Sequence, residues 1–449
     1  MKKILIIPGN TDLNRGDQAL VWESIRLVED VYGKDNVSCL LMTDLDSENS
    51  YAQNRQTAML GYQFVDTLIK HPGRKFKSKK EDSKGYSKLT LLQWGGQAIR
   101  DYLHTRLLLS CCKSLRVVGE MLLNRKEKET LKLIKECDTV FVKGGGFIHS
   151  YGGITDPYFI YYLTYHIRLA EAYKKDVFVL PNSVGPLKNR IAKRIALEAL
   201  EKCTYLTVRE NISRDFLKEH NVKAHLYPDL GFFLKPSESD MSDYLARRGV
   251  PLNQKKVAIT LRPYRFQGFN DAEKLYSNYI SGCVTLANFL YGKGYHITFL
   301  AHTLGPSSHE DDRIAIKEVR DALSDDVLKR SSYIEDFDLT CREVEKIYSY
   351  YDYMVGTRFH SVIFSLNVGV PAIAIAYGGN KSKGIMSELG NGLYSIDMDK
   401  IDDNNLIELF LSLETNRKDY LDSFRGTQKK LVEQRDRLVK TIRELQGDK

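Results

Sequence analysis

The chain is predicted to form an α/β protein with two domains, each built on a mostly parallel sheet wrapped by helices. In the first half, short apolar runs alternate with helical patterns, which is typical of βαβα connections. A segment rich in Pro, Ser and mixed charge follows residue 229, and the same alternation then restarts. The 449 residues are enough for two domains with cores of their own.

The first half contains short apolar runs bounded by turn residues, which we interpret as strands. They lie at residues 3–7, 37–42, 139–143, 177–181 and 206–209. Between them, apolar residues recur at helical spacing, which predicts helices at 17–32, 158–174, 189–203 and 213–220. This order favours a parallel sheet, because parallel strands need long crossover connections.

The second half repeats the pattern after a linker. Strands are predicted at 257–261, 296–301, 332–334, 353–355 and 372–376, and helices at 278–291, 315–323, 340–348 and 427–447. We therefore divide the chain into an N-terminal domain (1–235), a linker (236–254), a C-terminal domain (255–425) and a C-terminal helix (426–449). Two Rossmann-like domains joined by one linker predict a cleft between them.

The bulk composition excludes several classes of protein. No run of about 20 apolar residues is present, so no membrane-spanning helix is expected. The first apolar run ends at Pro8-Gly9, which is too short for a signal peptide. The seven cysteines are scattered without CxxC spacing, so we expect no disulfide framework and no zinc site. A reducing, cytoplasmic location follows.

The basic residues of the chain are concentrated in one segment. Residues 70–135 contain 17 Lys/Arg and 6 Asp/Glu, a net charge of 17 − 6 = +11 in a chain whose total is +8. This segment interrupts the βαβα order and looks like an insertion. With Phe76, Trp94 and several leucines beside the cations, it is a candidate for peripheral contact with an anionic membrane. The alternative is a solvated loop followed by an ordinary helical hairpin. Nucleic acid is not expected, since no nucleic-acid motif accompanies the charge.

The sequence GNTDLNRGDQAL (9–20) connects the first predicted strand to the first predicted helix. One interpretation is a ligand loop, in which Asn14 or Asp17 contacts sugar hydroxyls. The other is a structural turn in which the Asp17 carboxylate caps the helix. The segment lacks the Gly-Lys-Ser/Thr of a Walker loop and the spacing GxGxxG.

Three further strand ends carry candidate ligands. Gly144, Gly145 and Gly146 follow a strand, where their amides can approach an anion, or where they simply form a flexible turn. Arg262 ends the first strand of the second domain and is a candidate clamp for a carboxylate or phosphate; the alternative is a surface salt bridge. His302 ends the next strand in the same way.

Residues 353–386 contain the strongest cluster of candidate site residues. A strand ends in Gly356, Arg358 and His360 follow at once, and Lys381 and Lys383 open the helix after the next strand. Crevices at the carboxyl ends of parallel strands are where such sheets bind ligands. Cations beside an imidazole suit an anionic substrate whose reaction moves protons. The alternative is an arginine paired to an acid, with a capping histidine.

An ordered set of motifs resembles the polysaccharide pyruvyl transferase family. The motifs are N14-R-G-D17-x-A19, D138-x-V-F-V-K-G-G-G146, P181-N-S-V-G-P186, V208-R-E-N-I-S213, Y227-P-D229, R262-P, G356-T-R-F-H-S361 and V370-P-A-I-A-I-A-Y377. The resemblance implies a fold similar to GT-B glycosyltransferases and transfer of pyruvate from phosphoenolpyruvate onto two sugar hydroxyls, giving a ketal. The family's Arg and His carry over to Arg358 and His360, and its strand-end Arg to Arg262.

Two features depart from the family pattern. The family usually has Tyr-x-x-Lys after the last motif strand, whereas here Tyr377 is followed by Gly-Gly-Asn and then Lys381, so Lys381 and Lys383 compete for that role. The basic segment at 70–135 is not inherited from the family.

The resulting hypothesis is a ketal-forming pyruvyl transferase acting on a surface polysaccharide or its lipid-linked precursor at the inner face of the membrane. Arg358 and Arg262, helped by Lys381 or Lys383, would bind the two anionic groups of phosphoenolpyruvate. His360 would carry the proton. Neither a metal nor a cofactor is expected. Two alternatives stay open: a GT-B glycosyltransferase using a nucleotide sugar, and a non-catalytic glycan-binding protein.

Overall fold

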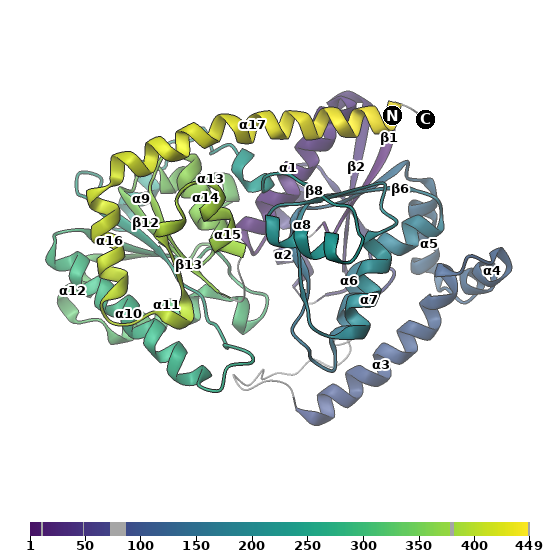
Figure 1. Cartoon of the computed structure of the whole chain (residues 1–449), viewed down its shortest axis with the longest axis horizontal. Helices are drawn as coiled ribbons and strands as arrows, with labels where there is room; N and C mark the ends of the chain where they lie inside the picture. Colours follow the sequence, from purple (N-terminus) through teal and green to yellow (C-terminus); the bar gives the residue numbers. More distant parts are fainter. Residues whose placement is uncertain (10–11, 48, 72–86, 378–380, 448–449) are drawn as a thin grey trace. The chain divides into compact units, whose positions relative to one another are not determined.

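The chain folds into two compact units, which are shown in the computed structural model of Figure 1. The structure describes residues 1–9, 12–47, 49–71, 87–377 and 381–447, without the side chains of 309 and 381–383. Unit 1 comprises Met1–Asn10, Leu20–Asp229 and Arg435–Lys449, and unit 2 comprises Thr11–Ala19 and Leu230–Gln434. Helices α1 (Arg15–Tyr32) and α17 (Arg417–Gly447) therefore each contribute to both units.

Unit 1 is built on a parallel sheet with the strand order β3-β2-β1-β4-β6-β7-β8. Its strands are β1 (Lys2–Ile7), β2 (Val37–Thr43), β3 (Gln63–Asp66), β4 (Thr139–Val142), β6 (Asp176–Leu187), β7 (Tyr205–Val208) and β8 (His225–Leu226), and β5 (Gly145–Ser150) pairs with β6. The central strands are apolar and buried, as expected for a sheet covered on both faces. The expected parallel sheet is confirmed.

The helices of unit 1 include those of the basic insertion. They are α2 (Ser50–Met59), α3 (Lys88–Arg106), α4 (Lys113–Met121), α5 (Arg125–Glu136), α6 (Asp156–Ala172), α7 (Arg190–Leu200) and α8 (Asn211–Glu219). Helix α5 begins with a capping box between Asn124 and Glu127. Figure 1 shows α3 and α4 along the outside of unit 1, away from its sheet. The insertion therefore contains helices, whereas most of the loop before them lies outside the described residues.

Unit 2 contains a parallel sheet with the order β11-β10-β9-β12-β13-β14. The strands are β9 (Lys256–Thr260), β10 (His296–Leu300), β11 (Ser331–Ile334), β12 (Tyr353–Gly356), β13 (Ala372–Ala376) and β14 (Ser395–Asp397). The other helices are α9 (Ser242–Arg247), α10 (Ala272–Gly292), α11 (Asp312–Ala322), α12 (Asp325–Lys329), α13 (Cys341–Tyr348), α14 (Phe359–Asn367), α15 (Lys381–Glu388) and α16 (Asn405–Thr415). In chain order the strands read 3-2-1-4-5-6, the Rossmann order.

The compact units differ from the expected domain boundaries in three places. Residues 11–19 and 230–235 group with unit 2, and residues 435–449 group with unit 1. The segment expected to be a linker, 236–254, contains α9, and the terminal helix begins at Arg417 rather than near 426. Within the described parts of the chain, no helix is long and apolar enough to cross a membrane.

Candidate functional site

The candidate site lies in unit 2 where the strand order reverses. β9 is the first strand of this sheet and has β10 on one side and β12 on the other, so the connections leave in opposite directions. Such a switch point leaves a crevice at the carboxyl ends of the strands. The two arginines Arg262 and Arg358 follow directly after the ends of β9 and β12.

Backbone pairing keeps the ends of β9 and β12 in register. Gly356 pairs with Thr260 in the sheet register. Beyond it, the amide and the hydroxyl of Thr357 donate to the carbonyl of Thr260 at 3.2 and 3.0 Å. A Cβ on Gly356 would lie 2.7 Å from the Oγ of Ser361, so glycine allows α14 to start directly against the strand end. This packing fixes where Arg358 emerges.

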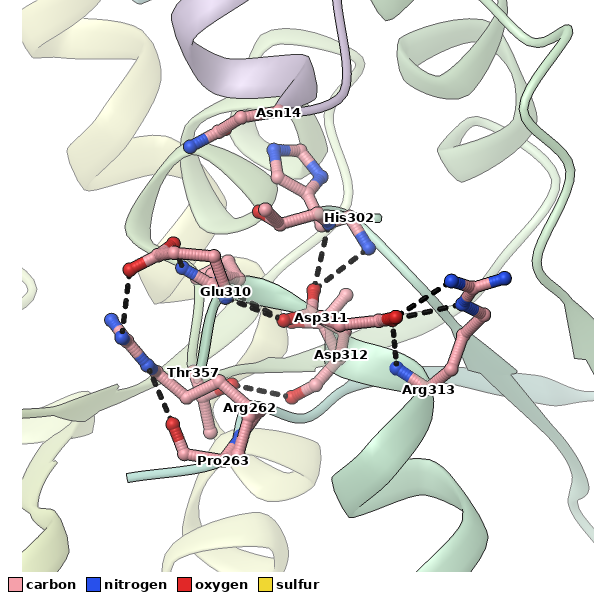
Figure 2. Close-up of polar contacts among 12 residues, drawn as sticks. Asn14, Arg262, Pro263, His302, Glu310, Asp311, Asp312, Arg313 and Thr357 are labelled. Atoms are coloured by element: carbon pink, nitrogen blue, oxygen red, sulfur yellow. Dashed lines mark hydrogen bonds and ion pairs between the residues drawn. The ribbon is translucent and has the colours of Figure 1, made fainter. Parts of the chain in front are cut away.

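Glu310 lies between the two arginines, as Figure 2 shows for Arg262. Its carboxylate accepts from Arg358 Nη1 at 2.9 Å and from Arg262 Nη2 at 3.5 Å. Its side chain is still 38% exposed. Burial alone would raise the pKa of Glu310, but Arg358 and Arg262 outweigh it and hold that pKa below its ordinary value. An anion therefore already occupies the position where the two guanidinium groups converge.

The Arg358 side chain is also tied to a fully buried carboxylate. Its Nε and Nη2 lie 2.8 and 2.7 Å from Oδ1 of Asp312, which is 0% exposed. Oδ2 of Asp312 accepts from the backbone amides of His302 and Thr303 at 3.0 and 2.8 Å. Burial raises the pKa of Asp312 to about 6, against the opposing effect of Arg358. Through these contacts Asp312 anchors Arg358 to the end of β10.

Arg262 has a different environment, formed largely by aromatic rings. Its guanidinium lies 4.0 Å from the ring centroid of Tyr377 and 5.5 Å from that of Tyr264. Besides the contact with Glu310, Nε donates to the carbonyl of Pro263 at 3.4 Å. Both polar contacts are long, so Arg262 can turn its N–H groups to another anion more readily than Arg358 can.

His302 lies beneath this arrangement and is 1% exposed. Its ring packs against Phe364 and Tyr348, and Nδ1 lies 3.3 Å from the Tyr348 hydroxyl. Burial, reinforced by His360, Arg358 and Arg15, lowers the pKa of His302 well below its ordinary value. His302 is therefore neutral, and the structure places it in the floor of the site rather than at its solvent-exposed surface.

His360 lies in the first turn of α14 and is half-buried. Gly16 of α1 approaches its ring: a Cβ built on Gly16 would lie 2.3 Å from Nδ1 and 2.6 Å from Cβ of His360. No residue with a side chain fits there without moving the imidazole. Gly16 thus sets the position of the proposed proton carrier, a role that the sequence analysis did not anticipate.

The segment containing Asn14 and Asp17 belongs to unit 2 and is held at the ends of β10 and β11. The backbone amide of Arg15 donates to the carbonyl of His302 at 3.1 Å. The Nη2 of the Arg15 side chain donates to the carbonyl of Asp336 at 2.9 Å. Asn14 Oδ1 accepts from the amides of Gly16 and Asp17 at 3.1 and 3.3 Å. Asn14 therefore caps α1, where the expected cap was Asp17. The Asp17 carboxylate accepts from Asn14 Nδ2 at 2.9 Å.

The glycine motif belongs to the other unit. Gly144 follows β4, and Gly145 and Gly146 begin β5 rather than a strand-to-helix turn. Gly145 pairs with Asn182 of β6 and has φ +148°, which favours glycine. These residues lie at the carboxyl end of β4 in unit 1. Their role as anion ligands stays a prediction.

Lys381 and Lys383 lie in the first turn of α15, which follows β13, and their side chains are outside the described residues. Which of the two lysines takes the role of the family's lysine stays open. No group of three or more His, Cys, Asp or Glu residues is placed to hold a metal ion among the residues that the structure describes.

Comparison with known proteins finds a family model that matches most of the chain. A family model described as "Polysaccharide pyruvyl transferase" matches residues 14–379. A protein of Erwinia amylovora described as "Amylovoran biosynthesis protein AmsJ" is 27% identical over 289 residues, which cover 61% of this chain and 65% of that protein. The match thus spans slightly less than two thirds of the relative's length.

Solved structures share the fold at low sequence identity. A putative UDP-N-acetylglucosamine 2-epimerase from Listeria monocytogenes has a TM-score of 0.54 and 10% identity, covering 94% of this chain and 90% of its own. UGT89C1 from Arabidopsis thaliana, complexed with UDP, has a TM-score of 0.55 and 11% identity, covering 98% and 99%. These similarities confirm the GT-B-like fold of two parallel α/β domains.

Proposed function

The chain belongs to the polysaccharide pyruvyl transferase family, and we propose that it moves pyruvate from phosphoenolpyruvate onto two hydroxyls of one sugar, forming a cyclic ketal. The acceptor would be a sugar of a surface polysaccharide or of its lipid-linked precursor. The related E. amylovora protein, whose description concerns amylovoran biosynthesis, supports a role in making a polysaccharide.

The convergence of Arg262 and Arg358 on one carboxylate carries this proposal. Guanidinium groups bind carboxylates and phosphates through the same N–H geometry. The two arginines that bind the Glu310 carboxylate therefore also suit the carboxylate of phosphoenolpyruvate. In this proposal the donor displaces Glu310 and is bound mainly by Arg262, while Arg358 stays anchored to Asp312. Lys381 or Lys383 would supply a further cation for the phosphate.

The proposed reaction removes two protons from the sugar hydroxyls and delivers one to the methylene carbon and one to the leaving phosphate. Protonation of the methylene carbon makes the adjacent carbon electrophilic, and a sugar hydroxyl adds there with loss of its proton. The carbon–oxygen bond to phosphate then breaks, and the second hydroxyl adds and loses its proton to close the ketal. His360, two residues after Arg358 and held against Gly16, is the proposed group that donates and accepts these protons.

Phosphate release from phosphoenolpyruvate in the presence of purified glycan acceptors tests the proposal. We expect release that depends on the acceptor, and a product heavier than the acceptor by one pyruvyl ketal. His360→Ala should reduce the rate by about 100-fold or more, because general acid–base groups contribute about that much. Arg262→Ala should raise the KM for phosphoenolpyruvate. A His360→Ala protein of unchanged activity would remove His360 from the mechanism.

The glycosyltransferase alternative is separated by ligand-induced stabilisation. A ligand that binds the folded protein raises its melting temperature. We expect phosphoenolpyruvate to do so and UDP or GDP to have no effect. The reverse pattern would favour a nucleotide-sugar enzyme, and glycan binding without turnover across an acceptor panel would favour a binding protein.

A further inference from the structure

Helix α3 of the basic insertion buries Trp94 and three polar residues, and it exposes several of its leucines. A helix at the surface of a protein normally buries its apolar face. In α3 the polar residues Gln97, Asp101 and Thr105 are buried, whereas Leu92 is 73% exposed and Leu103 is 65% exposed. The exposed apolar residues recur at helical spacing: Leu89, Leu92, Ile99 and Leu103. They lie on one face of the helix, where Gly96 stands between Leu92 and Ile99.

The buried polar face already has its partners inside unit 1. Gln97 Nε2 donates to Asp101 Oδ1 at 2.8 Å, and the Tyr158 hydroxyl donates to Asp101 Oδ2 at 3.1 Å. The Thr105 hydroxyl lies 2.9 Å from that of Tyr161. This face also borders a polar cavity of about 360 Å³. Because these contacts attach α3 to unit 1, the apolar stripe is not needed to hold the helix in place.

Helix α4 also exposes apolar side chains. It packs closely on the preceding turn through Gly119, where a Cβ would lie 3.0 Å from Leu107 and 3.1 Å from Leu108. The side chains that remain exposed are mostly apolar, with Met121 at 71%. We define the docking surface as Leu89, Leu92, Ile99 and Leu103 of α3 with Leu115, Val118 and Met121 of α4.

Three exposed cations accompany this surface. Lys88 at the start of α3, Arg100 in its middle and Lys113 at the start of α4 are exposed. None of the three forms an ion pair with another residue in the described ranges. Exposed leucines combined with uncompensated cations are the pattern of helices that lie in the interface of a bilayer containing anionic lipids.

We propose that the docking surface binds peripherally to an anionic membrane, with α3 and α4 lying in the headgroup region. A second copy of the chain is a less suitable occupant. A twofold interface would bring the same surface of two copies together, and with it the unpaired cations. Anionic headgroups neutralise these cations, and the acyl boundary accepts the leucines. The inference goes beyond the proposed function and is tested without measuring transfer.

Vesicle flotation with the full-length protein tests the apolar contribution. We expect binding to phosphatidylcholine vesicles containing phosphatidylglycerol, and at least about tenfold weaker partitioning for Leu92→Gln/Leu103→Gln, because two buried leucines are lost from the interface. Ile154→Gln/Ile191→Gln is the matched control, since both residues are exposed outside the insertion. Circular dichroism checks that each variant folds. Equal loss in both double variants, or no loss in either, would overturn the proposal.

The cationic contribution is tested with Lys88→Gln/Arg100→Gln/Lys113→Gln. Each near-surface cation contributes roughly fivefold in affinity at low salt, so this variant should lose about 100-fold, and added salt should weaken binding of the original protein. Equal binding to vesicles of phosphatidylcholine alone would overturn the proposal. So would a dimer in analytical ultracentrifugation that Leu92→Gln/Leu103→Gln dissociates while vesicle binding is absent.

A label at the connection between α3 and α4 reports the geometry directly. Cys111 and Cys112 lie there and are exposed. With Cys111 replaced by Ser, a polarity-sensitive fluorophore on Cys112 should shift to shorter wavelength on anionic vesicles, and the same label on an added cysteine at Ile191 should not. A shift at both positions, or at neither, would contradict docking through α3 and α4.

Discussion

At the scale of single residues, the two arginines of the candidate site do different things. Arg358 is buried and anchored to Asp312, which in turn accepts two backbone amides. Arg262 is held by aromatic faces and by long polar contacts. The sequence predicted an anion clamp at both positions. The structure assigns the fixed position to Arg358 and the adaptable one to Arg262.

Glu310 is expected to compete with the donor substrate. Glu310→Gln removes the anion between the arginines while Arg358 keeps Asp312. We therefore expect the KM for phosphoenolpyruvate to fall by roughly three- to tenfold at similar kcat, as the substrate no longer displaces a charge. Steady-state kinetics measures this. Asp321→Asn, which removes a carboxylate paired with Lys317 on the solvent side of α11, is the control. A raised KM with a reduced kcat would instead make Glu310 part of the chemistry.

Gly16 is expected to be essential for the position of His360. In Gly16→Ala the new methyl group would overlap the imidazole, so the ring must move. Displacing a catalytic group by about 1 Å can cost about 100-fold in rate, whereas overpacking costs about 1–3 kcal/mol of stability. Activity and urea unfolding, measured together, separate the two effects. Gly426→Ala in α17, where a Cβ meets open space, should leave activity unchanged. Full activity in Gly16→Ala would refute this role.

At the scale of elements, the sequence predicted the central strands and the edge strand β11, and missed the other three edge strands, β3, β8 and β14. β1, β4, β9, β12 and β13 are short apolar runs that are buried on both sides, and such runs are visible in any sequence. β3, β8 and β14 are edge strands, and most of their residues are only half-buried. Their polar residues hide the apolar signal, so hydrogen bonding to a neighbouring strand, not composition, decides them.

Asn14 is expected to act as the cap of α1 rather than as a ligand. Its side-chain oxygen accepts two helical amides, and its nitrogen donates to Asp17. Asn14→Ala should therefore lower the free energy of unfolding by about 1 kcal/mol, and Asn14→Ser should restore most of it. Chemical denaturation measures this. We expect Asn14→Ser to keep its activity; a stable Asn14→Ser protein that no longer binds acceptor would reinstate the ligand role.

At the scale of the whole molecule, local sequence located the cations of the site but not their partners. Arg262, Arg358 and His360 follow strands, where a local rule applies. Glu310 and Asp312 lie near the start of α11, and Gly16 lies near the start of α1. Only the folding of unit 2 brings them to Arg358 and His360. No spacing in the sequence encodes such contacts, which span between 46 and more than 300 residues of chain.

The protein should lose stability on mild acidification because several histidines are buried in the neutral form. Burial lowers the pKa of His296 to about 4. Below pH 6.5 the unfolded chain binds a proton that the folded chain does not, so stability falls with pH. Relative to His296→Gln, the original protein should lose about 1.4 kcal/mol more between pH 7.5 and 5.5. Urea unfolding at the two pH values measures the difference. If the original protein and His296→Gln lost the same free energy of unfolding between the two pH values, His296 would be protonated in the folded state.

The exchange of segments between units has a consequence for synthesis on the ribosome. Arg435 and Arg443 of α17 bind Asp30 and the carbonyl of Val31 in unit 1, with contacts of 2.6 and 3.2 Å. These residues are translated after the whole of unit 2. The first unit to emerge must therefore wait with part of its surface uncovered until the second has been made. Unit 1 can therefore complete its fold only after the ribosome has translated unit 2 and the end of α17.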